Sequence, residues 1–345
     1  MKKNHIKGIF RVVFIAVSIG SLFFVPWILV KAWILPLPDT VQEQVDEAID
    51  HGFDGMIVYV DEAGKPPAFY TGGWKDRENK IPTDPSALFK IASISKLYVA
   101  VAVTKLVKAN RLSLDQTLAE YFPELQGRIE NADKITIRMM VQHRSGIPNF
   151  TNNPAFWQDE QENGKRALDF ALDLPASFEP DAKYEYSNTN YLLLRRIIEQ
   201  VVGYDHFQFI KEEILIPLEL HNTFGSIAEV NLDDVMSGYY VGIEDDFKSN
   251  ENGMLATAED VGIFLRALNE GSVFDEGEQE IYSSIYVYEH GGLVPGYQSL
   301  AEYHEDINTV VVQFINTTNF DGYEWNLSEI VINRIVEIIR REKNS

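Results

Sequence analysis

Cysteine is absent from this chain of 345 residues. The absence excludes disulfides, thiolate metal sites and a cysteine nucleophile. It fits a cytosolic protein, and equally an exported protein from an organism that does not rely on disulfides. Internal repeats and low-complexity tracts are also lacking. With 45% hydrophobic and 24% charged residues, the composition is that of an ordinary globular protein. The length suits one large domain or two modest ones.

Basic residues are scarce relative to acidic ones. The chain has 30 Lys and Arg against 52 Asp and Glu, a net charge of -22, and residues 1–35 contain none of the acidic residues. Such a surface repels phosphate backbones, so we exclude a nucleic-acid partner. The seven histidines are scattered without an H-E-x-x-H pattern. We therefore expect neither a metal nor another cofactor.

Long apolar runs are lacking except at the N-terminus. Basic residues at positions 2, 3, 7 and 11 precede an uncharged run from Val12 to Val30. As one helix this run would span about 28 Å, close to the thickness of a bilayer core. The nearest match to a small-x-small cleavage site, Ser18 to Gly20, lies in mid-run, which favours an uncleaved anchor over a cleaved signal peptide.

The sequence thus predicts two parts, a membrane anchor and spacer over residues 1–38 and a folded domain over residues 39–345. The basic residues before the run place the N-terminus in the cytoplasm. We therefore expect a single-pass protein of the cell membrane, with the domain over residues 39–345 on the extracytoplasmic side. The sequence leaves the oligomeric state open.

The order of the expected elements favours an α+β fold. Strands near both ends of the chain can share one antiparallel sheet, with the terminal helices packed on it and a helical lobe inserted between. A capping box at Thr40 and Glu43 opens the first helix. The expected strands are Gly55–Val60, Ala68–Gly72, Ile285–Glu289, Ser299–Tyr303 and Thr309–Ile315, and the expected inner helices include Lys96–Asn110, Tyr191–Val202 and Ala258–Leu268.

Ser93 and Lys96 are the first candidates for chemistry. They stand three residues apart at the start of a helical run, so their side chains can meet on one face. Serine becomes a good nucleophile when a base removes its proton, and lysine is such a base when burial or nearby cations lower its pKa. By itself the pattern is weak, because S-x-x-K occurs by chance and a capped, solvated helix start explains it equally well.

Two further short motifs add polar groups. Tyr186 can relay protons, and the amide of Asn188 can hold a substrate carbonyl or the catalytic lysine. The pair of glycines after His290 lets a substrate backbone approach closely at the end of a strand. A tyrosine packed at a domain seam and an incidental histidine in a turn are the plain alternatives. Ser145 is a rival nucleophile, but it lacks the G-x-S-x-G elbow.

Together the three motifs resemble those of the serine β-lactamase and penicillin-binding protein superfamily. In that superfamily S-x-x-K, Y-x-N and a K-T-G or H-x-G element line one cleft. The closest resemblance is to the class C β-lactamase-like group, which also contains D,D-peptidases, D-amino-acid peptidases and esterases. It extends over about residues 50–315, and further similar segments are Phe89–Ala92, Arg111–Asp115, Ile135–Arg138, His143–Pro148, Ala256–Asp260 and His290–Tyr297.

The resemblance implies a β-lactamase-like fold and a serine hydrolase that works through an acyl-enzyme. Ser93 would be the nucleophile, Lys96 its base, and Tyr186 a group that assists the base and protonates the leaving group. Asn188, His290 and Gly292 would bind substrate, and the backbone N–H groups of Ser93 and Leu293 would bind the oxyanion. The substrate would be an ester, a D-amino-acid peptide or a β-lactam. The alternative is a penicillin-binding or regulatory protein with little or no turnover.

One departure from the family pattern concerns the substrate. The β-lactamases proper carry Lys-Thr-Gly where this chain has His290-Gly291-Gly292. A lysine side chain carries a permanent positive charge that can pair with a substrate carboxylate. A histidine side chain, with an ordinary pKa near 6.5, is mostly neutral at pH 7. We therefore expect uncharged esters or amides to be preferred over penicillins.

Overall fold

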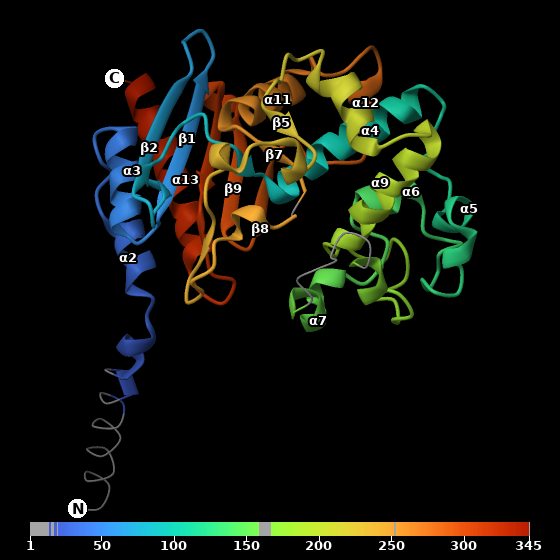
Figure 1. The fold of residues 1–345 in the computed structure, drawn as a ribbon, viewed down its shortest axis with the longest axis horizontal. Helices are drawn as coiled ribbons and strands as arrows, with labels where there is room; N and C mark the ends of the chain where they lie inside the picture. Colours follow the sequence, from blue (N-terminus) through green and yellow to red (C-terminus); the bar gives the residue numbers. More distant parts are fainter. Residues whose placement is uncertain (1–13, 15–16, 19, 159–166, 252, 345) are drawn as a thin grey trace, which may run out of the picture.

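Six strands form one antiparallel sheet in the computed structural model, which describes the chain except residues 1–13, 15–16, 19, 159–166, 252 and 345 (Figure 1). Strands from the two ends of the chain meet where Met56 pairs with Ile315, so the predicted shared sheet is confirmed. In sheet order the strands are β3 Ile81–Pro82, β2 Ala68–Asp76, β1 Gly55–Glu62, β10 Thr309–Ile315, β9 Tyr297–His304 and β8 His290–Val294.

The two faces of the sheet bury different helices. Met56 and Val58 point toward α3 (Val41–Asp50) and α13 (Glu324–Lys343), whose apolar side chains share one core cluster with them. Ile57 and Tyr59 point to the opposite face, where they join the larger core together with α4 (Ser95–Lys108) and α11 (Ala258–Glu270). Successive strand residues face opposite sides, so alternate residues of β1 contribute to both cores.

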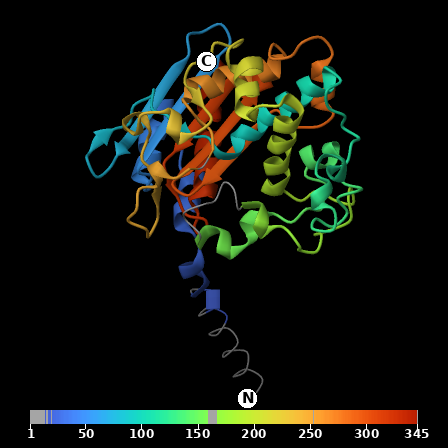
Figure 2. The same cartoon turned by 45° about the vertical axis from the view of Figure 1, so that its right-hand side comes forward.

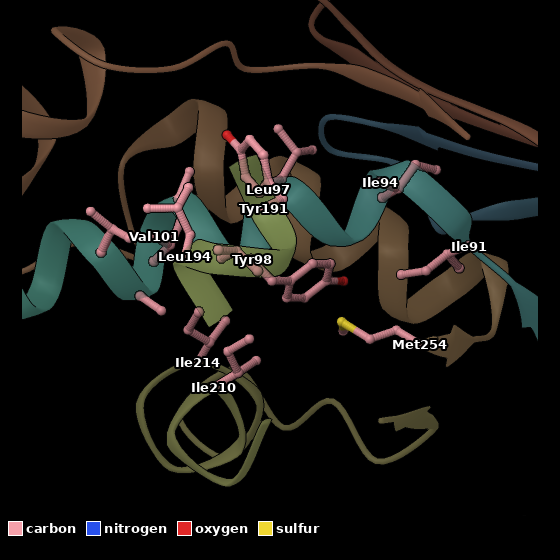
Figure 3. Close-up of a cluster of buried hydrophobic side chains, with 14 of the residues drawn as sticks. Ile91, Ile94, Leu97, Tyr98, Val101, Tyr191, Leu194, Ile210, Ile214 and Met254 are labelled. Carbon is pink, nitrogen blue, oxygen red and sulfur yellow. The ribbon is translucent and has the colours of Figure 1, made fainter. Parts of the chain in front are cut away.

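The middle of the chain forms a lobe of helices beside the sheet (Figures 1 and 2). Its central helix, α4, has buried residues from Ser95 to Leu106, and Tyr191 and Leu194 of α9 pack against it (Figure 3). The other elements of the region are α5 Leu118–Tyr121, α6 Ile137–Val141, α7 Pro154–Gln158, α9 Asn188–Val202, α10 His206–Ile210, α12 Glu278–Ser283, β4 Phe89–Lys90, β5 Thr223–Phe224, β6 Tyr239–Tyr240 and β7 Leu255–Ala256, with β11 Thr317–Thr318 after the sheet.

One predicted strand is wrong. Residues 285–289 form a turn and an irregular segment after α12, and the strand begins five residues later than predicted, at His290. Tyr286 and Tyr288 attach this segment to the core by side-chain packing, without a ladder. The glycine-containing segment that follows pairs with β9 in register, His290 opposite Ala301. The tertiary ladder therefore overrides the poor strand propensity of glycine, and the motif stands at the start of a strand instead of its end.

The N-terminal run is not one continuous helix. Its beginning lies outside the described residues. In the described part the chain is extended at Val25, where ψ is 127°, and α2 (Trp27–Ile34) starts after Pro26. Proline disfavours the α-conformation of the residue before it and lacks an N–H, which explains the break. Among the described residues no helix is both long and apolar enough to cross a bilayer.

The last part of the N-terminal segment packs on the domain. Ala32 of α2 is 2% exposed and belongs to the core cluster of α13. Arg334 of α13 donates hydrogen bonds to the carbonyl oxygens of Leu35 and Pro36 at 2.8 and 2.9 Å. The residues before α2 carry exposed apolar side chains, which include Phe23 and Phe24, both 85% exposed.

Candidate active site

Ser93 lies in a tight turn that joins β4 to α4. The turn is the 3₁₀ segment Ala92–Ile94, and Ala92 has a φ of 49°, a left-handed conformation that is uncommon for a residue with a side chain. Ile91 and Ile94 are fully buried on either side of the turn, whereas Ser93 is partly exposed. Two buried anchors therefore hold the turn so that the serine hydroxyl stays accessible.

Lys96 stands one turn further along and is almost completely buried, with 4% of its surface exposed. Its Nζ lies 2.9 Å from Ser93 Oγ and 2.8 Å from Asn188 Oδ1. Burial lowers the pKa of Lys96 well below its usual value, and the nearby Arg195 guanidinium lowers it further. A neutral amine can donate to the amide oxygen of Asn188 and accept the Ser93 proton with its lone pair, so this lysine can act as a base.

Helix α9 presents several polar side chains to this lysine. Asn188 is its first residue, and Tyr191 and Arg195 follow at three and seven residues, which places all three on one side of the helix. The Lys96 Nζ lies 5.5 Å from the centre of the Tyr191 ring, and Arg195 donates to Ser95 Oγ at 3.3 Å. Arg195 was missed from the sequence, although its position two helical turns after Asn188 could have indicated it.

Tyr186 contacts the nucleophile from the other side. Its hydroxyl lies 2.8 Å from Ser93 Oγ, and its ring centre is 5.0 Å from Lys96 Nζ. Burial raises the pKa of Tyr186 to about 12. The phenol therefore keeps its proton near neutral pH, and its hydroxyl can donate to Ser93 or to an atom that leaves from it. The lowered pKa of Lys96 and the raised pKa of Tyr186 therefore favour Lys96 as the base.

His143 supports the Tyr186 loop. Its imidazole ring is stacked on Tyr186 with ring centres 4.4 Å apart, and its Nδ1 accepts the backbone N–H of Ser187 at 3.1 Å. Burial lowers the pKa of His143 to about 3, so the ring is neutral. Ser145, the rival nucleophile, is buried and donates to Asn190 Oδ1 at 2.7 Å. These contacts give the His143–Ser145 turn a supporting position next to the site.

Strand β8 forms the third side of the site. A side chain at Gly292 would lie 2.4 Å from the carbonyl oxygen of Ile91 and 3.1 Å from Ala92 Cβ, so only glycine lets the strand approach the nucleophile turn this closely. Leu293 follows on the same strand with 38% exposure. His290, the first residue of β8, has its ring centre 6.2 Å from that of Tyr186. The predicted third motif therefore lies beside the other two.

The protonation of His290 follows from one contact. Its Nδ1 lies 2.5 Å from the carbonyl oxygen of Gly291. A carbonyl oxygen only accepts, so Nδ1 carries the hydrogen and the neutral ring presents the lone pair of Nε2. Burial lowers the pKa of His290 to about 4. At neutral pH this histidine therefore offers neither a positive charge nor a free N–H to a carboxylate.

Other candidate sites in the described part of the chain lack comparable chemistry. A cavity of about 490 Å³ is lined by residues 126–133 and 173–175, and none of the side chains discussed above lines it. Glu199, Asp205 and His206 hold ligand-type atoms within 4.8 Å of one another. His206 is already 2.8 Å from Glu199, and Asp205 caps the N-terminus of α10. Local structure thus accounts for that cluster.

Comparisons with known proteins agree with this geometry. The beta-lactamase family model matches residues 37–328. Protein flp of Staphylococcus aureus (strain MW2) is 26% identical over 195 residues, which are 54% of this chain and 39% of that protein. Penicillin-binding protein 4* of Bacillus subtilis (strain 168) is 28% identical over 179 residues, 50% of this chain and 38% of that protein. The matched regions are therefore about two fifths of these relatives.

Similar folds occur among solved structures. The D-amino acid amidase from Ochrobactrum anthropi SV3, solved as a complex with L-phenylalanine, superposes with a TM-score of 0.77 and 21% identity over 88% of this chain and 99% of that chain. Such a low identity shows the fold alone. Since the family model covers most of the sequence and the fold agrees, the chain belongs to the beta-lactamase family, and its fold is that of the serine β-lactamase and penicillin-binding protein superfamily.

Proposed function

We propose that the protein is a serine hydrolase that forms an acyl-enzyme on uncharged esters or amides. The observation that carries the proposal is Lys96, a buried lysine with a lowered pKa whose amine lies 2.9 Å from Ser93 Oγ. Burial of a cation is unfavourable unless it is paired, and the hydrogen-bond partners of Lys96 among the described residues are the neutral groups of Ser93 and Asn188. A neutral lysine beside a serine can take the hydroxyl proton and so activate the serine as a nucleophile.

The proposed reaction begins with transfer of the Ser93 proton to Lys96. Ser93 Oγ then bonds to the substrate carbonyl carbon, and the oxyanion is held by the backbone N–H groups of Ser93 and Leu293, as the family resemblance implies. As the bond to the leaving group breaks, Tyr186 gives that group a proton and recovers one from Lys96. Asn188 keeps Lys96 in place and can contact the substrate carbonyl. A water molecule then releases the acyl group.

His290 indicates that the substrate is uncharged. The Nε2 lone pair of the neutral ring repels a carboxylate, and a pKa of about 4 means that a positive charge develops only in acid. The similar proteins include a D-amino acid amidase and a penicillin-binding protein, so amides stay among the proposed substrates. The alternative is a penicillin binder with slow turnover. A steady-state assay separates the two, since a binder releases product only once per protein.

The test compares a short-chain nitrophenyl ester with a penicillin. We expect the wild type to have the higher kcat/KM for the ester. His290→Lys should move the ratio toward penicillin by about ten- to a hundredfold, because a hydrogen bond to a charged group contributes about 1.5–3 kcal/mol. His221→Lys, on the exposed surface, is the control and should leave the ratio unchanged. A wild type that already hydrolyses penicillin faster than the ester would show that the argument from His290 is wrong.

We also propose that the N-terminal segment anchors the protein in the cell membrane with the hydrolase domain outside. The proposal rests on the basic residues before Val12 and on the exposed apolar side chains of the described part of the segment. Phe14 and Trp33 are 72% and 76% exposed. Water-exposed aromatic side chains of this size are stabilised in a bilayer or at its interface.

A further inference from the structure

A cavity adjoins the candidate active site on the side of Tyr186. Its volume is about 360 Å³, within the range of roughly 300–1,000 Å³ that is typical of small-molecule sites. Its lining residues come from the turn after α6, the Tyr186 loop and the irregular segment before β8, and they are Gln142, His143, Arg144, Tyr184, Ser283–Val287 and His290. Neither Ser93 nor Lys96 lines the cavity, so it is a space next to the reacting atoms.

Two histidines connect this cavity to the reacting atoms. His143 is stacked on the Tyr186 ring, and the His290 ring lies 6.2 Å from the same ring. Both histidines line the cavity, and the hydroxyl of Tyr186 lies 2.8 Å from Ser93 Oγ. A leaving group that Tyr186 protonates would therefore lie close to this cavity.

The walls of the cavity are aromatic and carry no unpaired charge. Tyr286 stacks against His290 with ring centres 6.1 Å apart, and Tyr184 makes an edge contact of 5.9 Å with His143. The one cation of the lining, Arg144, forms an ion pair with Asp181 at 2.5 Å. Both histidines are neutral near pH 7. Such a lining favours an aromatic or bulky apolar group over a charged one.

We propose that this cavity is the subsite for the leaving group and that it selects substrates whose leaving group is an aryl or bulky apolar alcohol. The inference rests on the proposed function, since Tyr186 must be the proton donor. In the reaction Ser93 Oγ gains the acyl group, the bond from the carbonyl carbon to the leaving oxygen breaks, and that oxygen takes one proton and departs as the neutral alcohol into the cavity.

The first test measures kcat/KM for 2-naphthyl acetate and phenyl acetate, which share the acyl group and differ in the size of the leaving alcohol. We expect the wild type to prefer the naphthyl ester about tenfold, because the second ring buries further apolar surface. Val287→Trp, at a half-exposed position of the lining, fills part of the cavity and should abolish this preference. Ile216→Trp, exposed and outside the cavity, is the matched control.

Tyr184→Ala removes an exposed aromatic wall and is a second variant in case the tryptophan impairs folding. It should also reduce the naphthyl preference. A wild-type ratio near one, or a ratio that survives both changes, would overturn the subsite.

The second test needs no turnover, so it separates this inference from the proposed function. Equilibrium dialysis of 2-naphthol against the Ser93→Ala protein should show saturable binding that Val287→Trp weakens at least tenfold. If the wild type hydrolyses neither acetate but this binding is found, the proposed reaction is wrong and the cavity remains an aryl site. If binding is absent, or unaffected by Val287→Trp, the subsite is wrong even if both esters are hydrolysed.

Discussion

At the scale of single residues, the state of Lys96 decides what the site can do. Its side chain is taken out of water, and its hydrogen-bond partners are the neutral groups of Ser93 and Asn188. Arg195 adds a positive charge nearby. Burial and the Arg195 charge disfavour the ammonium form, and neither hydrogen-bond partner carries a negative charge that would offset them. A free amine therefore lies beside the serine hydroxyl. The pKa of Tyr186 is raised, because burial disfavours the phenolate. Its proton therefore stays available for the leaving group.

The Arg195 charge can be tested through the pH profile of kcat/KM for an ester. The neutral amine is the active form, so activity rises as the pH passes upward through the pKa of Lys96. Arg195→Gln removes a positive charge, raises the pKa of Lys96 and moves this rise to higher pH. On the rising part of the profile, each unit of pKa increase costs about tenfold in activity, which is regained at higher pH.

Arg196→Gln is the matched control, because the next residue of α9 points about 100° away around the helix. Its profile should coincide with that of the wild type. An Arg195→Gln profile reduced by the same factor at every pH would contradict the electrostatic role and would leave only a structural one.

Several residues of the candidate site could be predicted from the sequence, and others could not. Ser93 and Lys96 share a face through their local spacing, and the two other motifs followed from their resemblance to one family. Arg195 and His143 act across long sequence separations, by a charge and by ring stacking, and short motifs carry no such information. The shift of the His290 pKa to about 4 instead of 6.5 depends on burial, which the sequence leaves open.

At the scale of elements, strand β8 and the nucleophile turn depend on one close approach. The two segments are joined only by tertiary packing, and Gly292 sits where any side chain would meet the backbone of Ile91. The sheet ladder accounts for the misplaced strand as well. Residues 285–289 are rich in aromatic and β-branched side chains but lack a partner strand, whereas residues 290–294 lie opposite β9. Periodicity and composition predict β1, β10 and the long helices well because their core patterns are local.

Gly292→Ala tests this approach. The new Cβ must push β8 away from the Ser93 turn, so we expect kcat/KM for an ester to fall at least tenfold. Overpacking of this kind should also lower the free energy of unfolding by about 1–3 kcal/mol. Gly291→Ala is the control on the same strand, because its Cβ would meet the side chains of Trp325 and Leu300, which can move. Equal losses of activity in the two variants would refute the specific role of Gly292.

At the scale of the whole molecule, the beta-lactamase-family domain and the apolar N-terminal segment are joined through α2. This helix packs against α13, while the residues before it leave their aromatic side chains exposed. Because this segment lies directly before the domain, an anchor formed by it would hold the domain close to the membrane surface.

Cell fractionation tests the anchor. The full chain should sediment with membranes, resist extraction by salt and dissolve in detergent. A protein that lacks residues 1–26 should stay in the supernatant, because it lacks most of the apolar run. It should still fold, because it retains α2 and its packing on α13. Protease added to intact cells should remove the domain and leave an N-terminal tag protected. A full chain found in the supernatant, or a domain shielded from the protease, would contradict the proposed topology.

The central claim, that Ser93 is a nucleophile activated by Lys96, is tested most directly by covalent labelling of the full chain with a fluorophosphonate probe and mapping of the adduct by mass spectrometry. The account predicts one adduct, on Ser93. Labelling should be lost in Ser93→Ala and slowed at least a hundredfold in Lys96→Met, since removal of a general base typically costs about 10²–10⁴ in rate. Lys108→Met, at the exposed end of the same helix, should label like the wild type. An adduct that persists in Ser93→Ala, or that maps to Ser95 or Ser145, would contradict the claim.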